Sequence, residues 1–239
     1  MNRSNLQSLT SNLLSKNYAI IVAGGSGIRM LSAVPKQFLL LNGRPVLMHT
    51  IEAFHHSESK PQIIVVLHPD FHAYWEELCK IHDFNIVHQL VNGGETRFHS
   101  VKNGLDQIPD AADVLIAVQD AVRPLTSGLI IDESYKHAAA HGNAVTAVKS
   151  RDSVRQAANG GTKSLMRDEI WLIQTPQTFQ SAQIKKAYQQ PFSAKFTDDA
   201  SIVEQTGDTI HLIEGSYRNI KITFPEDIAI AEMLMVHGS

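Results

Sequence analysis

The sequence has little of several features that would mark a specialised class of protein. It contains one cysteine in 239 residues, Cys79, which excludes an internal disulfide framework and a cysteine-rich zinc module and indicates a reducing compartment. Its 21 Lys and Arg against 24 Asp and Glu give a formal charge of −3, so it lacks the overall basic surface of a nucleic-acid or membrane-surface binder. It also lacks any apolar stretch near the roughly 20 residues that span a bilayer. We therefore expect a cytoplasmic protein whose partners include neither nucleic acid nor membrane.

Hydrophobic residues make up 43% of the chain, and they gather in short runs with helical segments between them. The runs expected to form strands are Tyr18 to Ala23, Ile63 to Leu67, Asp113 to Val118 and Ala144 to Val148, with weaker ones at Asn85 to Leu90, Thr209 to Ile213 and Asn219 to Thr223. Helical spacing is found over 45–56, 70–82, 96–107, 127–140 and 181–190, and Pro225 opens a last helix to about Val236. This alternation predicts an α/β fold, a Rossmann-like open and mostly parallel sheet with helices on both faces. Ligands of such sheets bind at the carboxyl ends of the strands.

Two segments fall outside this alternation. Residues 1–17 form a polar N-terminal extension without the apolar run of a secretory signal, so we predict a single domain over 18–239. Within that domain, residues 150–168 are polar and contain Asn159-Gly160-Gly161, a strong hairpin-turn signal. We expect a hairpin arm that packs on a second subunit of a homodimer; a long surface loop is the alternative.

The first predicted strand is followed by a glycine-rich loop, Gly24-Gly25-Ser26-Gly27-Ile28-Arg29. Closely spaced glycines let backbone amides approach a ligand, and exposed N–H groups beside a guanidinium bind anions. The loop matches no common phosphate motif, because the dinucleotide fingerprint needs a third glycine at Met30 and the sequence has no Gly-Lys-Ser/Thr of a P-loop. We interpret it as a phosphate loop of another kind, with a plain turn as the alternative.

Two charged residues stand where such a phosphate site needs them. Lys36 follows Pro35, which fixes the backbone, and its compact ammonium suits a triphosphate. Asp120 lies immediately beyond a predicted buried strand, where a carboxylate can hold Mg²⁺ while substrate phosphates complete the coordination shell. Taken alone, Lys36 also fits a solvated surface position, and Asp120 also fits a helix cap. Arg123, three residues on, is expected to contact a phosphate or to stabilise the loop.

Further motifs follow in order along the chain. They are Gly93-Gly94-Glu95-Thr96-Arg97-Phe98-His99-Ser100, Asp120-Ala121-Val122-Arg123-Pro124, Thr175-Pro176-Gln177, Thr197-Asp198-Asp199-Ala200-Ser201, and Asn219-Ile220-Lys221-Ile222-Thr223 before Pro225-Glu226-Asp227. With the glycine loop and Lys36, this set resembles the cytidylyltransferases that activate alditol phosphates, and most nearly the 2-C-methyl-D-erythritol 4-phosphate cytidylyltransferase family. The resemblance covers nearly the whole chain after the extension. It implies magnesium-dependent transfer of CMP from CTP to the alditol phosphate, with release of pyrophosphate, in isoprenoid precursor synthesis.

The resemblance also implies roles for individual residues. Catalysis would rest on Arg29, Lys36, Asp120 and Lys221, with Asp120 as the Mg²⁺ ligand. The residues implied to bind CTP are Ala23, Gly24, Gly25, Gly27, Gly94, Glu95, Arg97 and Ser100, with the cytosine read around Gly94, Glu95 and Ser100. Those implied to hold the alditol phosphate are Arg123, Ser153, Arg167, Thr197 and Lys221, with Ser153 and Arg167 on the arm and acting across the dimer interface. Without the resemblance, Arg97 and Lys221 also fit solvent-facing positions.

Four positions depart from the commonest family pattern and leave open which alditol is used. They are Gly24 in place of alanine, Ile28 in place of a basic residue, Gln119 in place of histidine and Ser153 in place of threonine. Ribitol-5-phosphate cytidylyltransferase is therefore an alternative within the class. A non-catalytic nucleotide-binding regulator would keep the glycine loop but tolerate loss of Lys36 and Asp120, and both are present. A dinucleotide-dependent oxidoreductase is disfavoured by the missing third glycine.

Overall fold

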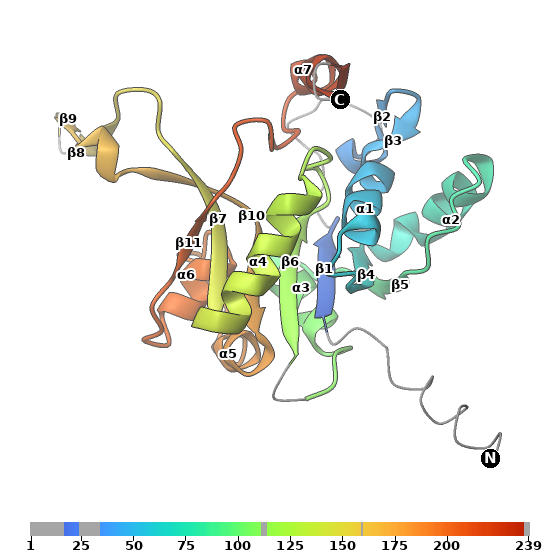
Figure 1. Ribbon diagram of the computed structural model, residues 1–239, viewed down its shortest axis with the longest axis horizontal. Helices are drawn as coiled ribbons and strands as arrows, with labels where there is room; N and C mark the ends of the chain where they lie inside the picture. The colour runs from blue at the N-terminus through green and yellow to red at the C-terminus, as the bar shows by residue number, and fades with distance from the viewer. Residues whose placement is uncertain (1–16, 24–33, 111–113, 159, 237–239) are drawn as a thin grey trace, which may run out of the picture.

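The computed structural model describes residues 17–23, 34–110, 114–158 and 160–236. A seven-stranded sheet in the order β11-β7-β10-β6-β1-β4-β5 forms its centre (Figure 1). Its strands are β1 (Asn17–Val22), β4 (Gln62–Leu67), β5 (Gln89–Asn92), β6 (Leu115–Asp120), β7 (Asn143–Lys149), β10 (Trp171–Gln180) and β11 (Leu212–Glu214). All neighbouring pairs are parallel except those of β10, which is antiparallel to both β6 and β7. The predicted open, mostly parallel α/β sheet is confirmed.

Helices cover both faces of this sheet (Figure 1). They are α1 (Val46–His56), α2 (His72–Ile81), α3 (Arg97–Leu105), α4 (Gly128–His141), α5 (Ser181–Ala187), α6 (Asp199–Glu204) and α7 (Glu226–Val236). Short 3-10 turns lie at η3 (Lys36–Phe38), η4 (Pro69–Phe71) and η5 (Arg167–Glu169), and β2 (Leu40–Leu41) pairs with β3 (Arg44–Pro45). None of these helices combines the length and the hydrophobicity needed to cross a membrane.

The two-sided core explains why the central strands are continuous apolar runs. Successive side chains of a strand point to opposite faces, so Ile20 and Ile21 of β1 enter different clusters and both are fully buried. Ile21 lies in the cluster that contains Trp75 of α2, whereas Ile20 lies in the cluster that contains Phe98 of α3. A strand buried on both faces cannot alternate with polar residues.

The structure corrects three of the predicted strands and contains elements that were not predicted. Strand β10 was not predicted, because its sequence WLIQTPQTFQ mixes polar residues and a proline into the run; the six-residue helix α6 was not predicted either. Residues 219–223 do not form a strand. The strand expected over 85–90 begins at Gln89 instead, and β6 extends to Asp120, which is therefore the last residue of the strand rather than the first beyond it.

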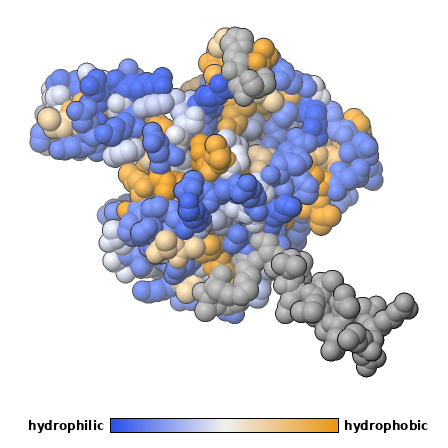
Figure 2. All heavy atoms as spheres, in the orientation of Figure 1, coloured by the Kyte–Doolittle hydropathy of each residue, from blue (hydrophilic) through white to orange (hydrophobic). Residues whose placement is uncertain are grey.

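The segment expected to be an arm is a hairpin. β8 (Arg155–Ala158) pairs antiparallel with β9 (Gly161–Ser164), and every residue of both strands is exposed. Figure 1 shows this hairpin well away from the seven-stranded sheet, and Figure 2 shows its surface to be mainly hydrophilic. The alternative of a long loop without strands is wrong.

Candidate active site

A cavity of about 260 Å³ lies at the carboxyl ends of the sheet strands. It takes in six of the predicted residues: Ala23, Lys36, Glu95, Arg97, Asp120 and Lys221. A second cavity of similar size shares Arg97, Asp120 and Lys221 with the first and adds Arg123 and Thr197. The structure thus brings together residues from five separate motifs, as expected for the carboxyl edge of an open sheet.

Asp120 is the electrostatic centre of these two cavities. Its Oδ2 lies 2.9 Å from Nζ of Lys221 and 3.4 Å from Nε of Arg123, while its Oδ1 lies 3.7 Å from Nε of Arg97. Burial alone would favour the neutral acid, but the charges of Arg97, Lys221 and Arg123 outweigh it and hold the pKa of the Asp120 carboxyl well below its usual range. The group is therefore a carboxylate at any physiological pH. Its contacts do not match the helix cap considered from the sequence.

Arg97 is the first residue of α3, whose N-terminus is capped by Thr96. Its Nη1 and Nη2 donate to the two carboxylate oxygens of Asp199, at 2.9 and 2.6 Å. Asp199 is fully buried and also accepts a hydrogen bond of 2.5 Å from the hydroxyl of Tyr188. Burial opposes the charge on Arg97, yet Asp199 and Asp120 together raise the pKa of its guanidinium. The solvated position considered for Arg97 is wrong: the side chain is a fixed cation at the cavity wall.

Lys221 is exposed, as in the solvent-facing alternative, but its ammonium is paired with a carboxylate at the cavity. It lies in an irregular segment, so the side-chain alternation of a strand does not direct it. Instead its ammonium contacts Asp120, as given above. The next residue, Ile222, is fully buried, and its N–H donates to the carbonyl of Val122 at 2.9 Å, just past β6.

The turn expected to read the cytosine is built around Ser100. The Ser100 hydroxyl accepts from the N–H of Gly94 at 3.0 Å and donates to the carbonyl of Thr96 at 2.9 Å. The N–H of Gly93 donates to the carbonyl of Leu67 at 2.8 Å. A Cβ at Gly94 would lie 2.4 Å from Cβ of His99, so only glycine fits there. The amides of Gly93 and Gly94 are thus engaged within the protein.

Lys36 begins the short turn η3 beside the first cavity. The next residue, Gln37, is buried, and its Nε2 donates to the carbonyl of Ala23 at 2.9 Å, which ties η3 to the end of β1. Phe38 is buried in the core against Trp75, with 6.3 Å between the ring centroids. Gln37 was not among the predicted site residues, although it lines the first cavity. In the sequence, only its position between Lys36 and the apolar Phe38 could have indicated a role at the site.

Among the predicted residues that the structure describes, Gly94, Ser100, Ser153 and Arg167 do not line these two cavities. Gly24, Gly25, Gly27 and Arg29 lie outside the described residues. Ser153 and Arg167 are exposed at the two sides of the arm, where Arg167 is within 3.6 Å of Asp168. Thr197 does line the second cavity and is exposed there. In a single chain, therefore, the arm residues do not reach Asp120.

The side chains at the two cavities suit a metal ion that is bound by few protein ligands. The part of the chain that the structure describes holds no cluster of three or more His, Cys, Asp or Glu side chains able to bind a metal ion. Mg²⁺ is typically held by one or two carboxylates, with substrate phosphates and water supplying the remaining oxygens. Asp120 offers one such carboxylate, and its Oδ1 is beyond hydrogen-bond distance of the nearest cation. The residues present fit Mg²⁺ bound together with a phosphate substrate.

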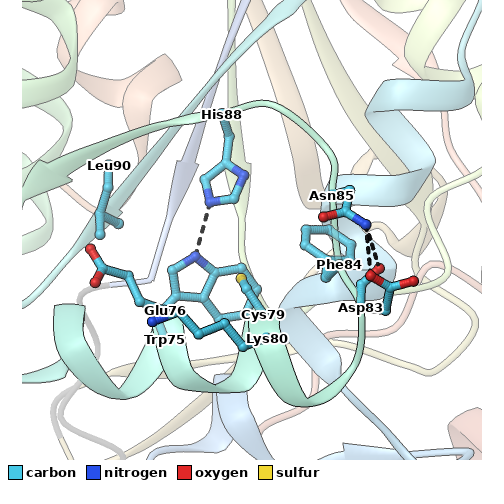
Figure 3. Close-up of a pocket in the computed structure, with 9 residues that line it drawn as sticks. All are labelled: Trp75, Glu76, Cys79, Lys80, Asp83, Phe84, Asn85, His88 and Leu90. Atoms are coloured by element: carbon cyan, nitrogen blue, oxygen red, sulfur yellow. Dashed lines mark hydrogen bonds between the residues drawn. The ribbon is translucent and has the colours of Figure 1, made fainter.

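A third cavity, of about 590 Å³, lies away from this site between α2 and the segment before β5 (Figure 3). It contains none of the predicted catalytic or binding residues. At its centre the indole N–H of Trp75 donates to Nε2 of His88 at 2.9 Å. Burial raises the pKa of the Cys79 thiol in its wall to about 11, which makes that thiol a poor nucleophile at neutral pH.

The comparisons of this chain with known protein families, sequences and structures all point to the same family. The family model described as 2-C-methyl-D-erythritol 4-phosphate cytidylyltransferase matches residues 18–237. The chain is 44% identical to the protein of that name from Bacteroides fragilis, over 91% of this chain and 98% of the relative. It is 46% identical to the one from Porphyromonas gingivalis, over 92% and 98%. The crystal structure of 4-diphosphocytidyl-2C-methyl-D-erythritol synthase from Anaerococcus prevotii covers 92% of this chain and 96% of its own, with 28% identity and a TM-score of 0.79.

Proposed function

The chain belongs to the 2-C-methyl-D-erythritol 4-phosphate cytidylyltransferase family, and we propose that it transfers CMP from CTP to 2-C-methyl-D-erythritol 4-phosphate. The products are 4-diphosphocytidyl-2-C-methyl-D-erythritol and pyrophosphate, and the reaction belongs to isoprenoid precursor synthesis. The observation that carries the proposal is the Asp120 carboxylate, enclosed by Lys221, Arg123 and Arg97 at the edge of the sheet beside Lys36. Such a site holds phosphate groups by charge.

The reaction is an in-line displacement at phosphorus. A phosphate oxygen of the alditol phosphate attacks the α-phosphorus of CTP, the new P–O bond forms, and the bond to the β-phosphate oxygen breaks, so that pyrophosphate leaves. Catalysis of this kind depends on positioning and charge stabilisation rather than on a covalent enzyme intermediate. Lys36 would neutralise charge on the CTP phosphates. Lys221 would hold the acceptor phosphate while its contact with Asp120 fixes its position.

Mg²⁺ would be held by Asp120 with phosphate oxygens of CTP, and when bound it supplies neutralisation of charge on the triphosphate. Glu95 and the turn around Gly94 would take the cytosine. Thr197 and Arg123 line the cavity that would take the alditol phosphate. The remaining contacts of the proposed site come from Gly24, Gly25, Gly27 and Arg29, in the loop outside the described residues.

The arm extends the proposal to a homodimer. Two-stranded hairpins are marginal in water by themselves, so the exposed β8–β9 hairpin needs a surface to pack on. A two-fold dimer with exchanged arms would provide that surface and would carry Ser153 and Arg167 to the partner's acceptor site. The remaining elements of the proposal are a single domain over 18–239 after an extension at 1–17, and a cytoplasmic location, which the single cysteine supports.

The test is a parallel assay of pyrophosphate release. Purified protein is given CTP and Mg²⁺ with either 2-C-methyl-D-erythritol 4-phosphate or ribitol 5-phosphate, and the reaction is repeated with excess EDTA. We expect release with the methylerythritol substrate, little release with ribitol 5-phosphate, and loss of activity in EDTA. Turnover of ribitol 5-phosphate alone would overturn the choice of acceptor. Full activity in EDTA would remove the metal from the proposal.

A further inference from the structure

Lys221 must be held in place without the help of a sheet ladder, because residues 219–223 form no strand. Its backbone is fixed on both sides instead. On one side Ile222 is buried and bonded to Val122. On the other side, two residues away, Asn219 is fully buried. The position of the Lys221 ammonium therefore depends on what holds Asn219.

Asn219 uses all of its polar groups in the interior. Its Nδ2 donates to the carbonyl of Thr175 at 2.9 Å and to Oε1 of Gln174 at 3.2 Å, both on β10. Its own carbonyl accepts from Nη1 of Arg123 at 2.7 Å. Its Oδ1 accepts from the hydroxyl of Thr126 at 2.9 Å. These bonds tie the segment before Lys221 both to β10 and to the loop after β6.

Thr126 completes this network from a buried position. Its hydroxyl lies 2.9 Å from Oδ1 of Asn219 and 3.1 Å from the carbonyl of Arg123, which share its one proton as acceptors. The same hydroxyl accepts from Nε2 of Gln119 at 3.0 Å, and Gln119 is itself fully buried directly before Asp120. One hydroxyl thus connects the strand that carries the carboxylate with the segment that carries the lysine. Removing it would leave a buried acceptor on Asn219 and a buried donor on Gln119 unpaired, a state that proteins avoid by shifting the backbone or admitting water.

We propose that Thr126 and Asn219 are positioning residues for the cytidylyl transfer, which hold the Lys221 ammonium against the carboxylate of Asp120. Neither residue lines the two cavities, so both act through Lys221 and neither contacts a substrate. The inference rests on the proposed function for its kinetic consequence. Its structural consequence, the Lys221–Asp120 contact, can be observed without any activity.

The test uses Thr126→Val, which keeps the shape of the side chain and removes the hydroxyl, and Thr126→Ser, which restores the hydroxyl. Thr178→Val is the matched control, because it removes another fully buried threonine hydroxyl, bonded at 2.8 Å to Oγ of Ser134 on α4. Asn219→Ser tests the same network from its other end should Thr126→Val not fold. The kinetic constants are measured for CTP and the acceptor separately, and Thr126→Val is also measured in a Lys221→Met background.

We expect Thr126→Val to lower kcat/KM for the acceptor about tenfold, since small displacements of a positioning group have large kinetic costs. The KM for CTP should stay within twofold, Thr126→Ser should restore the rate, and Thr178→Val should leave it unchanged. In the Lys221→Met background the Thr126→Val change should have no further effect, because residues that act through one another are not additive. Thr126→Val kinetics equal to those of the parent chain, or an equal loss with and without Lys221, would overturn the proposal.

A crystal structure of Thr126→Val tests, without any measurement of activity, whether Thr126 maintains the contact between Lys221 and Asp120. We expect Nζ of Lys221 to leave hydrogen-bond distance of Asp120, and an unchanged contact would overturn the proposal. The two proposals fail separately. If the parent chain releases no pyrophosphate from CTP and 2-C-methyl-D-erythritol 4-phosphate, the proposed function fails, while the crystal structure still tests whether Thr126 positions Lys221.

Discussion

The ammonium of Lys221 lies 2.9 Å from Oδ2 of Asp120, although the two residues come from distant parts of the sequence. Asp120 ends strand β6, and Lys221 lies in an irregular segment after the last strand. The contact neutralises part of the charge on each group before any substrate binds. It also places a cation next to the carboxylate that we propose as the Mg²⁺ ligand.

Replacing either Lys36 or Asp120, two of the charged groups at the cavity, should remove most of the activity. Lys36→Ala and Asp120→Asn are each expected to lower kcat about 10²- to 10³-fold, because each group acts on charge that develops in the transition state. Asp120→Asn should also lower the thermal midpoint, since buried Arg123 loses its anionic partner. Lys136→Ala, at an exposed position of α4, is the control and should change neither quantity. A rate within threefold of the parent chain for either site variant would contradict the assignment.

The chain should select CTP over UTP, ATP and GTP. A pocket that hydrogen-bonds the cytosine amino group leaves buried polar groups unpaired with the wrong base, which gives strong rejection. Gly94→Ala should weaken CTP binding, because its Cβ would lie 2.4 Å from Cβ of His99 and the turn would have to move. The measurement is the KM for each nucleotide in both proteins. Gly128→Ala, at the first residue of α4 where the added Cβ meets no neighbour, is the control. Comparable turnover with UTP would indicate a broader nucleotidyltransferase.

Activity should depend on exchange of the arms in a dimer. Arg167→Ala and Lys36→Ala subunits, each nearly inactive alone, are mixed and allowed to exchange. If the arm serves the partner's site, one site of the mixed dimer carries both lesions and the other carries neither, so about half of the rate per dimer should return. Purification through two different tags, one on each variant, establishes that mixed dimers have formed. Formation of mixed dimers without recovery would show that Arg167 serves its own subunit or lies outside the site.

The free energy of unfolding should fall below about pH 6.5 through His88. Burial lowers the pKa of His88, whose Nδ1 bonds to the carbonyl of Ile86 at 2.7 Å while Nε2 accepts from Trp75 (Figure 3). A proton on Nε2 would face the indole N–H. The unfolded chain therefore binds the proton more readily, so this stabilisation is present at higher pH and is lost as the pH falls.

Urea unfolding across pH 5 to 8 measures this dependence. His88→Asn should flatten the fall of the curve below about pH 6.5, where the unfolded histidine takes up a proton more readily than the folded one. His55→Gln, at an exposed helix end, should leave the curve unchanged. An identical pH dependence in His88→Asn and the parent chain would exclude His88 as the source.

Local pattern was enough to determine much of the fold. β1, β4, β6 and β7 were predicted because a strand buried on both faces must be a continuous apolar run, whatever its neighbours are. The hairpin arm was predicted because Asn159-Gly160-Gly161 favours a tight turn by its backbone alone. The motifs at Lys36, Asp120 and Lys221 also indicated the family that the comparisons confirm.

Only the tertiary structure decided the rest, because those features depend on partners far away in the sequence. Strand β10 is polar along much of its length and becomes a strand by pairing between β6 and β7. Local pattern assigns both Arg97 and Lys221 to solvent. Arg97 is only partly exposed and is held by the carboxylate of Asp199, whereas Lys221 is exposed but paired with the carboxylate of Asp120. The position of a charged side chain depends on the opposite charge with which it pairs. Because that partner is distant in the sequence, the neighbouring residues do not reveal it.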